Sequence, residues 1–159
     1  MSRISATARE RILAQGFCGL NDATYAQINY PLRLAPAICM LWTAAGTALA
    51  SPMILWALVP FAALGAILPG HPFDVFYNYG LRHLFGSPAL PRYGARRRFA
   101  CALATVMLVI AAWAFQTGTP TVGFIAGWSL VAAAFANVST GFCIPSFMVS
   151  IFLGKPASE

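Results

Sequence analysis

HPFDVFYNYGLRHLFGSPALPRYGARRR, residues 71–98, is a polar stretch between two long segments without charge. Before it, residues 34–70 are 37 residues without Asp, Glu, Lys, Arg or His. After it, residues 99–154 are 56 more. Each segment exceeds the roughly 20 apolar residues that one helix needs to cross a bilayer, so the pattern predicts a membrane protein.

Composition supports the same class. Hydrophobic residues make up 59% of the 159-residue chain and charged residues only 9%, whereas a soluble domain has about 25% charged residues. The length fits one domain. The basic residues that give the net charge of +6 flank the apolar segments, where such residues orient a protein in a bilayer. No nucleic-acid motif accompanies them. Lipid, and not nucleic acid, is therefore the expected surrounding.

Each uncharged segment is long enough for a helical hairpin. Residues 34–70 would form a single helix of roughly 55 Å, against roughly 30 Å of hydrocarbon. Ser51-Pro52 and Gly118-Thr119-Pro120 are turn sequences that divide the two segments. The predicted spans are 32–49, 53–69, 98–116 and 121–141, with small residues such as Gly123 and Gly127 allowing close helix packing.

The predicted fold is an all-α integral membrane protein with four transmembrane helices in two hairpins. Its single domain comprises a cytoplasmic N-terminal segment (1–31), a first hairpin (32–69), a cytoplasmic amphipathic loop (70–97), a second hairpin (98–141) and an interfacial or partly re-entrant tail (142–159). All fourteen charged residues, ten basic and four acidic, lie outside the two turns. The positive-inside rule then predicts a bacterial inner-membrane protein with both termini in the cytoplasm.

The cytoplasmic loop is predicted to contain a surface helix at about 72–85. Its polar face would carry the following residues: His71, Asp74, Asn78 and Arg82. Its apolar face would carry Phe73, Phe76, Tyr77, Gly80 and Leu84. This division predicts a helix that lies on the membrane surface.

The cysteines offer one chemical hypothesis. Cys18 and Cys143 share the local sequence Gly-Phe-Cys, and both are expected at the cytoplasmic end of the bundle, so they are candidate redox thiols. The alternative is that both are small apolar residues at helix ends. Cys39 and Cys101 are interpreted as packing residues, because cysteine behaves as a small hydrophobe.

No other catalytic or cofactor motif is present in the sequence, and none of the cysteines matches a zinc or iron–sulfur spacing. His71, Asp74 and His83 are weak candidates for metal ligands, since a spacing of twelve does not place the two histidines on one helix face. No cofactor is expected.

Short motifs add a family resemblance. They are Ile28-Asn29 followed by Arg33, the sequence Arg-Arg-Phe-Ala from Arg97 to Ala100, and Phe142-Cys143 near the end. In this layout the chain resembles a bacterial membrane-protein family known as domain of unknown function 4395, over about residues 16–153. The resemblance implies no established activity, but it implies thioredoxin-like or sulfur-transfer proteins as partners. Ile144, Pro145 and Ser146 follow Cys143, which excludes a local dithiol.

The favoured function is a small accessory or scaffold protein of the inner membrane without catalysis of its own. A membrane thiol-redox or sulfur-handling component using Cys18 and Cys143 is the main alternative. A small-molecule permease is a third, but the predicted spans contain no ionisable group. The chain is also compatible with a homo-oligomer.

Overall fold

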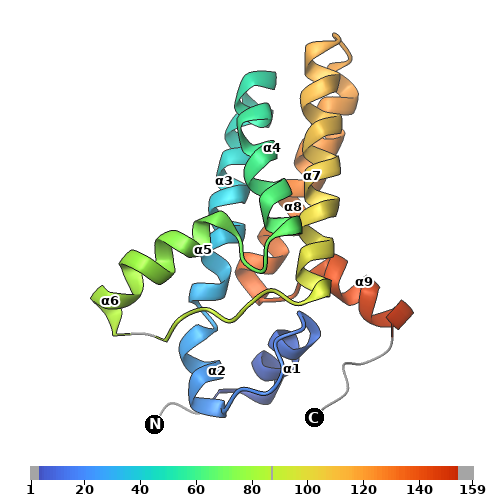
Figure 1. Ribbon diagram of the computed structural model, residues 1–159. Coiled ribbons are helices and arrows are strands. Elements are labelled where there is room, and N and C mark those ends of the chain that lie inside the picture. The colour runs from blue at the N-terminus through green and yellow to red at the C-terminus, as the bar shows by residue number, and fades with distance from the viewer. Residues whose placement is uncertain (1–3, 87, 154–159) are drawn as a thin grey trace.

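The computed structural model describes residues 4–86 and 88–153, and every regular element within them is helical. Four long helices form an antiparallel bundle (Figure 1). They are α3 (Leu34–Ala48), α4 (Pro52–Ile67), α7 (Ala95–Gln116) and α8 (Pro120–Thr140). The contacts join α4 to α7, α7 to α8, and α3 to both α8 and α4. The prediction of an all-α fold is confirmed.

Both turns at the far end of the bundle follow local chemistry. Pro52 and Pro120 each stand in the first turn of a helix, where the missing N–H costs nothing. Gly118 turns the chain between α7 and α8 with a φ of +75°. The expected breaks between the helices of each hairpin are therefore found.

In the part of the chain that the structure describes, two helices, α7 and α8, are long and apolar enough to cross a membrane. A third candidate is α4 together with the segment Pro72–Leu81, if this pair, bent by 80°, forms one span. With 15 and 16 residues, α3 and α4 are each roughly 23 Å long, shorter than typical hydrocarbon thickness. Two to three apolar helices indicate a membrane protein, and four spans stay a prediction.

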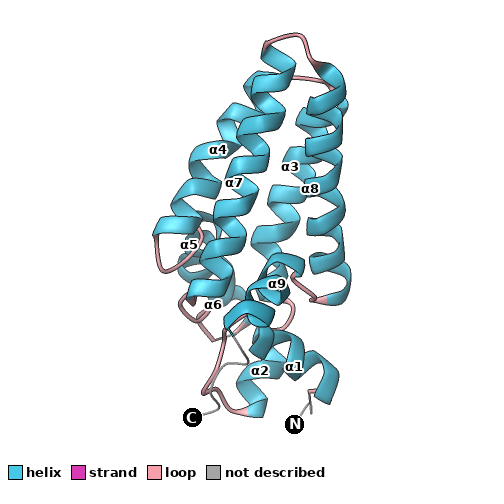
Figure 2. Cartoon of the chain, turned by 90° about the vertical axis from the view of Figure 1, so that its right-hand side faces the viewer, coloured by secondary structure: helices cyan, strands magenta, loops and turns pink. Residues whose placement is uncertain are grey.

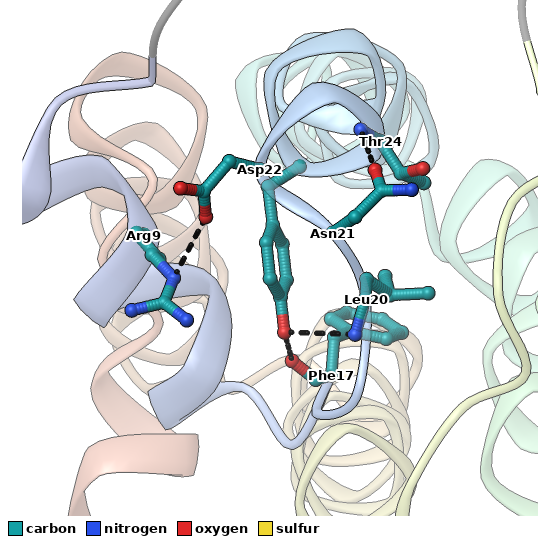
Figure 3. A network of polar contacts seen from close by, with 7 residues as sticks. Arg9, Phe17, Leu20, Asn21, Asp22 and Thr24 are labelled. Carbon is teal, nitrogen blue, oxygen red and sulfur yellow. Dashed lines mark hydrogen bonds and ion pairs between the residues drawn. The ribbon is translucent and has the colours of Figure 1, made fainter.

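The N-terminal segment lies at the end of the bundle opposite the turns of the two hairpins (Figures 1 and 2). It contains α1 (Ala6–Ala14), α2 (Asp22–Ile28) and the short η1 (Pro31–Arg33). An Arg9–Asp22 ion pair of 3.2 Å joins α1 to α2, and the Asn21 side chain caps α2 by accepting from the Thr24 N–H (Figure 3). The predicted tail contains α9 (Ile144–Leu153), which packs mainly on α7.

Arginines at this end bind the carbonyl ends of the bundle helices. Arg33 donates to the Val138 and Ser139 carbonyls at 2.9 and 3.0 Å, at the end of α8. Arg98 donates to Ala66 and Ile67 at 2.9 and 2.7 Å, at the end of α4. Cations are favoured here because the last carbonyls of a helix lack partners and carry partial negative charge.

The segment between the hairpins is helical as predicted, but its faces differ from the prediction. It consists of α5 (Pro72–Phe76), the π-helical turn η2 (Tyr77–Leu81) and α6 (Arg82–Phe85). His71 and Asp74 are buried, each 4% exposed, together with Phe73 and Tyr77, whereas Phe76 is 70% exposed. The predicted polar face is thus wrong for His71 and Asp74, whereas the exposed Phe76 is compatible with the predicted apolar face. The bend below α4 turns the helix so that its polar start faces the bundle.

Candidate functional site

A cavity of about 120 Å³ lies inside the bundle, in the half nearest the arginines. Its polar and thiol lining comes from α3, α7, α8 and the segments next to them: Cys39, Thr43, His71, Tyr93, Arg97, Cys101, Asn137 and Cys143. Small and apolar side chains, among them Ala62, Ala104 and Ala133, make up most of the remaining wall. Three of the four cysteines therefore face one internal space.

His71 contacts the thiol side of this cavity. Its Nδ1 accepts from the Phe73 N–H at 3.4 Å, which caps α5, and its Nε2 lies 3.8 Å from the Cys39 sulfur. Since Nδ1 acts as acceptor, the proton of the neutral ring belongs on Nε2, from where it points to Cys39. The ring is thus a donor to sulfur in this arrangement.

Gly65 on α4 makes room for this contact. A Cβ built at Gly65 would lie 2.5 Å from His71 Cδ2 and 3.2 Å from the Cys101 sulfur. Any larger residue would therefore force the imidazole or the thiol away. The missing side chain at Gly65 therefore allows His71 and Cys101 to pack against the same position on α4.

Cys143 stands directly before α9, and the Ser146 hydroxyl donates to its sulfur at 3.1 Å. The Phe147 N–H bonds to the Cys143 carbonyl at 2.9 Å, so the residue occupies the cap of the helix. A helix N-terminus with a hydroxyl donor is the setting in which nucleophilic cysteines are found. Of the three cavity thiols, Cys143 has the surroundings best suited to attack.

Arg97 connects the cavity to the N-terminal segment. Its guanidinium donates to Gln15 Oε1 and, at 2.6 Å, to the Leu32 carbonyl. The rings of Tyr93 and Phe17 lie against it, with centroids 4.7 and 5.4 Å from the guanidinium carbon. Gln15 in turn donates to the Gly141 carbonyl at 2.8 Å. This buried arginine therefore holds α1, η1 and the end of α8 around the cavity.

The structure places the predicted site residues as follows. Cys18 is exposed and does not line the cavity, whereas Cys143 does. All four cysteines are free. His83 is exposed on α6, away from the buried His71 and Asp74, and the described residues contain no group of three or more His, Cys, Asp or Glu arranged to hold a metal ion.

Cys39 and Cys101, which the sequence predicts to be packing residues, line the cavity, and their sequences share a signal. The two stand in the same local sequence, Cys-x-Leu-x-Thr, once in α3 and once in α7. In both, the threonine hydroxyl donates to the carbonyl of the cysteine, at 2.7 Å from Thr43 and 2.8 Å from Thr105. The repeat marks equivalent positions in the first helix of each hairpin.

Burial changes the protonation of the two ionisable groups beside the thiols. It lowers the pKa of His71 from 6.5 to about 4, and the charge of Arg97 adds to this effect. It also raises the pKa of Asp74, against the opposing influence of the Tyr93 hydroxyl and Arg97. His71 is therefore neutral at pH 7.

This shift predicts an acid-sensitive fold. A histidine with a lowered folded pKa binds its proton more readily when unfolded, so His71 destabilises the fold as pH falls from 6.5 towards 4. The loss approaches roughly 3 kcal/mol at about 1.4 kcal/mol per pH unit. Asp74 acts in the opposite sense, because its raised pKa weakens the fold as pH rises.

The measurement is thermal unfolding in detergent between pH 4 and 7, for the native protein and for His71→Asn. Asparagine can keep the cap of α5 but does not titrate. We expect the native protein to lose more stability than the variant on acidification, which separates His71 from Asp74. Parallel pH profiles would contradict the assignment.

One family matches the sequence over residues 29–153, and it is described as Domain of unknown function (DUF4395). The matched region contains all four bundle helices and the cavity cysteines. The helices α1 and α2 precede it in the sequence. No curated protein and no solved structure gives a significant match.

Proposed function

The chain belongs to the family of DUF4395 domains, and from its site we propose that it is a membrane thiol protein whose internal cysteines react with small sulfur-containing molecules. The observation that carries this proposal is the meeting of Cys39, Cys101 and Cys143 at one cavity. Cysteines that served only as packing residues would not be expected to meet at one cavity. The class of function is the predicted sulfur-handling alternative, with a different set of thiols.

The chemistry is thiol–disulfide exchange. The Cys143 sulfur attacks one sulfur of an incoming disulfide, whose S–S bond breaks and whose other half leaves as a thiol with the proton from Cys143. Cys39 or Cys101 then attacks the mixed disulfide and releases the second thiol. Two electrons pass from two cysteines to the incoming molecule, which is reduced to two thiols while a cysteine pair is oxidised.

The cavity suits this exchange. Its wall is mostly apolar, which limits competing water, and His71 presents a donor to the Cys39 sulfur. The Thr43 and Thr105 hydroxyls donate hydrogen bonds to backbone carbonyls one helical turn earlier in their own helices. A polar path for a permease is therefore poorly supported, whereas a chamber for a small sulfur compound is well supported.

We place the protein in the bacterial inner membrane with four spans in two hairpins and the arginine end in the cytoplasm. Apolar side chains on the outer faces of the bundle support lipid contact, including Met53, Ile67, Val106, Trp113 and Ile125. The short α3 and α4 would require a locally thinner bilayer, which costs only fractions of a kcal/mol per Å. Both termini would then be cytoplasmic.

A non-catalytic accessory protein is the second candidate. It is favoured by an exposed aromatic face near the cytoplasmic end, where Phe76 and Tyr79 are 70% and 82% exposed. A thioredoxin-like or sulfur-transfer protein is the partner expected for either function. In the accessory role the cavity thiols would be inert.

The test is labelling of the purified protein in detergent with methyl methanethiosulfonate, followed by digestion without reductant and mapping by mass spectrometry. Exposed Cys18 is the internal control for reagent activity. We expect labelling at Cys143 and, with limiting reagent, a disulfide from Cys143 to Cys39 or Cys101. Cys143→Ser should abolish that disulfide and leave Cys18 labelling unchanged.

Other outcomes decide between the alternatives. If only Cys18 reacts, the cavity thiols are inert and the accessory function is favoured. If the disulfide joins Cys18 to Cys143, the redox pair predicted from the sequence replaces the cavity set.

A further inference from the structure

Arg97 gives the cavity a property that thiol exchange alone does not use. We infer that the cavity binds a small anion with a thiol-reactive sulfur, of the chemical class of thiosulfate, with its oxygens on Arg97 and its terminal sulfur towards Cys143. This inference rests on the proposed function and adds to it the charge and the class of the substrate.

The guanidinium is a buried cation with unused donors. Arg97 is 4% exposed, and its hydrogen bonds to Gln15 and Leu32 use two of the five N–H groups that arginine carries. Within the described residues no carboxylate oxygen lies within 4.0 Å of the Arg97 nitrogens. The ion pair found among those residues joins Arg9 to Asp22. A buried charge is costly without a counter-ion, so an anion in the cavity would be stabilised.

The neighbouring groups leave this positive charge in place. Asp74 does not line the cavity, and its burial favours the protonated form. His71 faces the cavity but is neutral at pH 7, since its pKa is lowered to about 4. The remaining charged residue of the lining is Arg97 itself. The cavity wall therefore presents one cation and no carboxylate to an anion.

Size and polarity restrict the anion. A cavity of about 120 Å³ is smaller than the roughly 150 Å³ cavity that holds benzene, so it admits only a few non-hydrogen atoms. The Tyr93 and Phe17 rings lie 4.7 and 5.4 Å from the guanidinium carbon of Arg97, and the three cysteines line other parts of the cavity. A ligand with oxygens at one end and sulfur at the other matches this arrangement.

The reaction balances without an added oxidant. The Cys143 sulfur attacks the terminal sulfur of thiosulfate, the S–S bond of the anion breaks, and sulfite leaves with the bonding electron pair. A persulfide remains on Cys143 and keeps the proton of the original thiol. Arginine suits the leaving oxyanion, because its planar donors match such groups.

The experiment compares small probes on the purified full chain in detergent. Thiosulfate should release sulfite and leave one added sulfur atom on Cys143, seen in the mapped peptide. Sulfate, which lacks a transferable sulfur, is the matched anion and should give no modification. Methyl methanethiosulfonate is the neutral reagent that reports thiol reactivity without using the charge.

Two variants separate charge from space. Arg97→Gln should lower the rate with thiosulfate roughly tenfold or more relative to its own rate with the neutral reagent, because the ratio of the two rates corrects for any change in the shape of the cavity. Ala104→Leu fills the cavity and leaves the contacts of Arg97 intact, so it should reduce both reactions. This second variant remains informative if Arg97→Gln fails to fold.

Each outcome bears on a separate statement. If the neutral reagent modifies Cys143 but thiosulfate does not, the anion inference is overturned and the proposed thiol function stands. Equal thiosulfate rates in the native protein and Arg97→Gln, or an unchanged rate in Ala104→Leu, would also overturn it. If neither reagent reacts, both the inference and the proposed function fail.

Discussion

Replacing Arg97 with methionine is expected to lower the free energy of unfolding by about 2–4 kcal/mol, measured by denaturant titration in detergent. Methionine keeps an apolar chain near the rings of Tyr93 and Phe17. It removes the donors for Gln15 Oε1 and the Leu32 carbonyl, and each acceptor left unpaired in a buried site costs about 1–3 kcal/mol.

The matched control is Arg92→Met, which removes an exposed arginine a few residues earlier in the chain and should be nearly neutral. Adding Gln15→Met to Arg97→Met removes one unpaired acceptor, so the double variant should lose less than the sum of the single variants. Strict additivity, or a loss equal to that of Arg92→Met, would show that Arg97 does not organise this end of the bundle.

Gly127→Ala is the second large effect, with an expected loss of about 1–3 kcal/mol in the same assay. In an isolated helix the change would stabilise by up to about 1 kcal/mol. In the bundle the new Cβ would lie 2.2 Å from Thr47 Oγ1 and 2.7 Å from its Cγ2, so α3 and α8 would have to separate. The close approach of these helices therefore depends on this glycine.

Thr47→Ala supplies the rescue. It removes the two nearest atoms and leaves a contact of 3.0 Å to the Thr47 Cβ, so it should restore most of the lost stability in the double variant. It also removes a buried hydroxyl without a hydrogen-bond partner. Gly80→Ala is the control, because a Cβ there meets nothing within 4 Å. If Gly80→Ala proved as harmful as Gly127→Ala, the packing argument would not hold.

The helices were predictable because their limits are local. Pro52 and Pro120 begin helices in the structure, at the places where the sequence predicted that the preceding helices end. The Gly123 and Gly127 spacing likewise predicted close packing, and both residues are buried. Signals of this kind depend on a few neighbouring residues and are visible without knowledge of the fold.

The orientation of the segment 72–85 was not predictable in this way. Its polar residues suggested an aqueous face, because isolated histidine and aspartate favour water. The actual surroundings come from distant parts of the chain: the bend after α4, the room left by Gly65, and Arg97 on α7. Such contacts depend on tertiary structure, which overrides the local pattern.

The candidate site was predicted in part. The Gly-Phe-Cys sequence shared with Cys18 makes Cys143 a candidate thiol, and Cys143 lines the cavity whereas Cys18 does not. Cys39 and Cys101 were interpreted as packing residues, because cysteine has no polar neighbour in either sequence. Only the packing of the two hairpins against each other brings Cys39 and Cys101 to the same cavity. This packing is a property of the whole bundle.

The arginine contacts at the ends of α4 and α8 have a practical consequence for mapping the membrane topology. A common test moves or removes basic residues and asks whether the orientation inverts. Here Arg33 and Arg98 also bind the terminal carbonyls of bundle helices, so their removal would unfold helix ends as well as alter the charge balance. An inverted or degraded variant would then report on folding and on orientation together. Reporter tags inserted in the turns at 49–51 and 117–119 would leave these arginines in place and measure orientation alone.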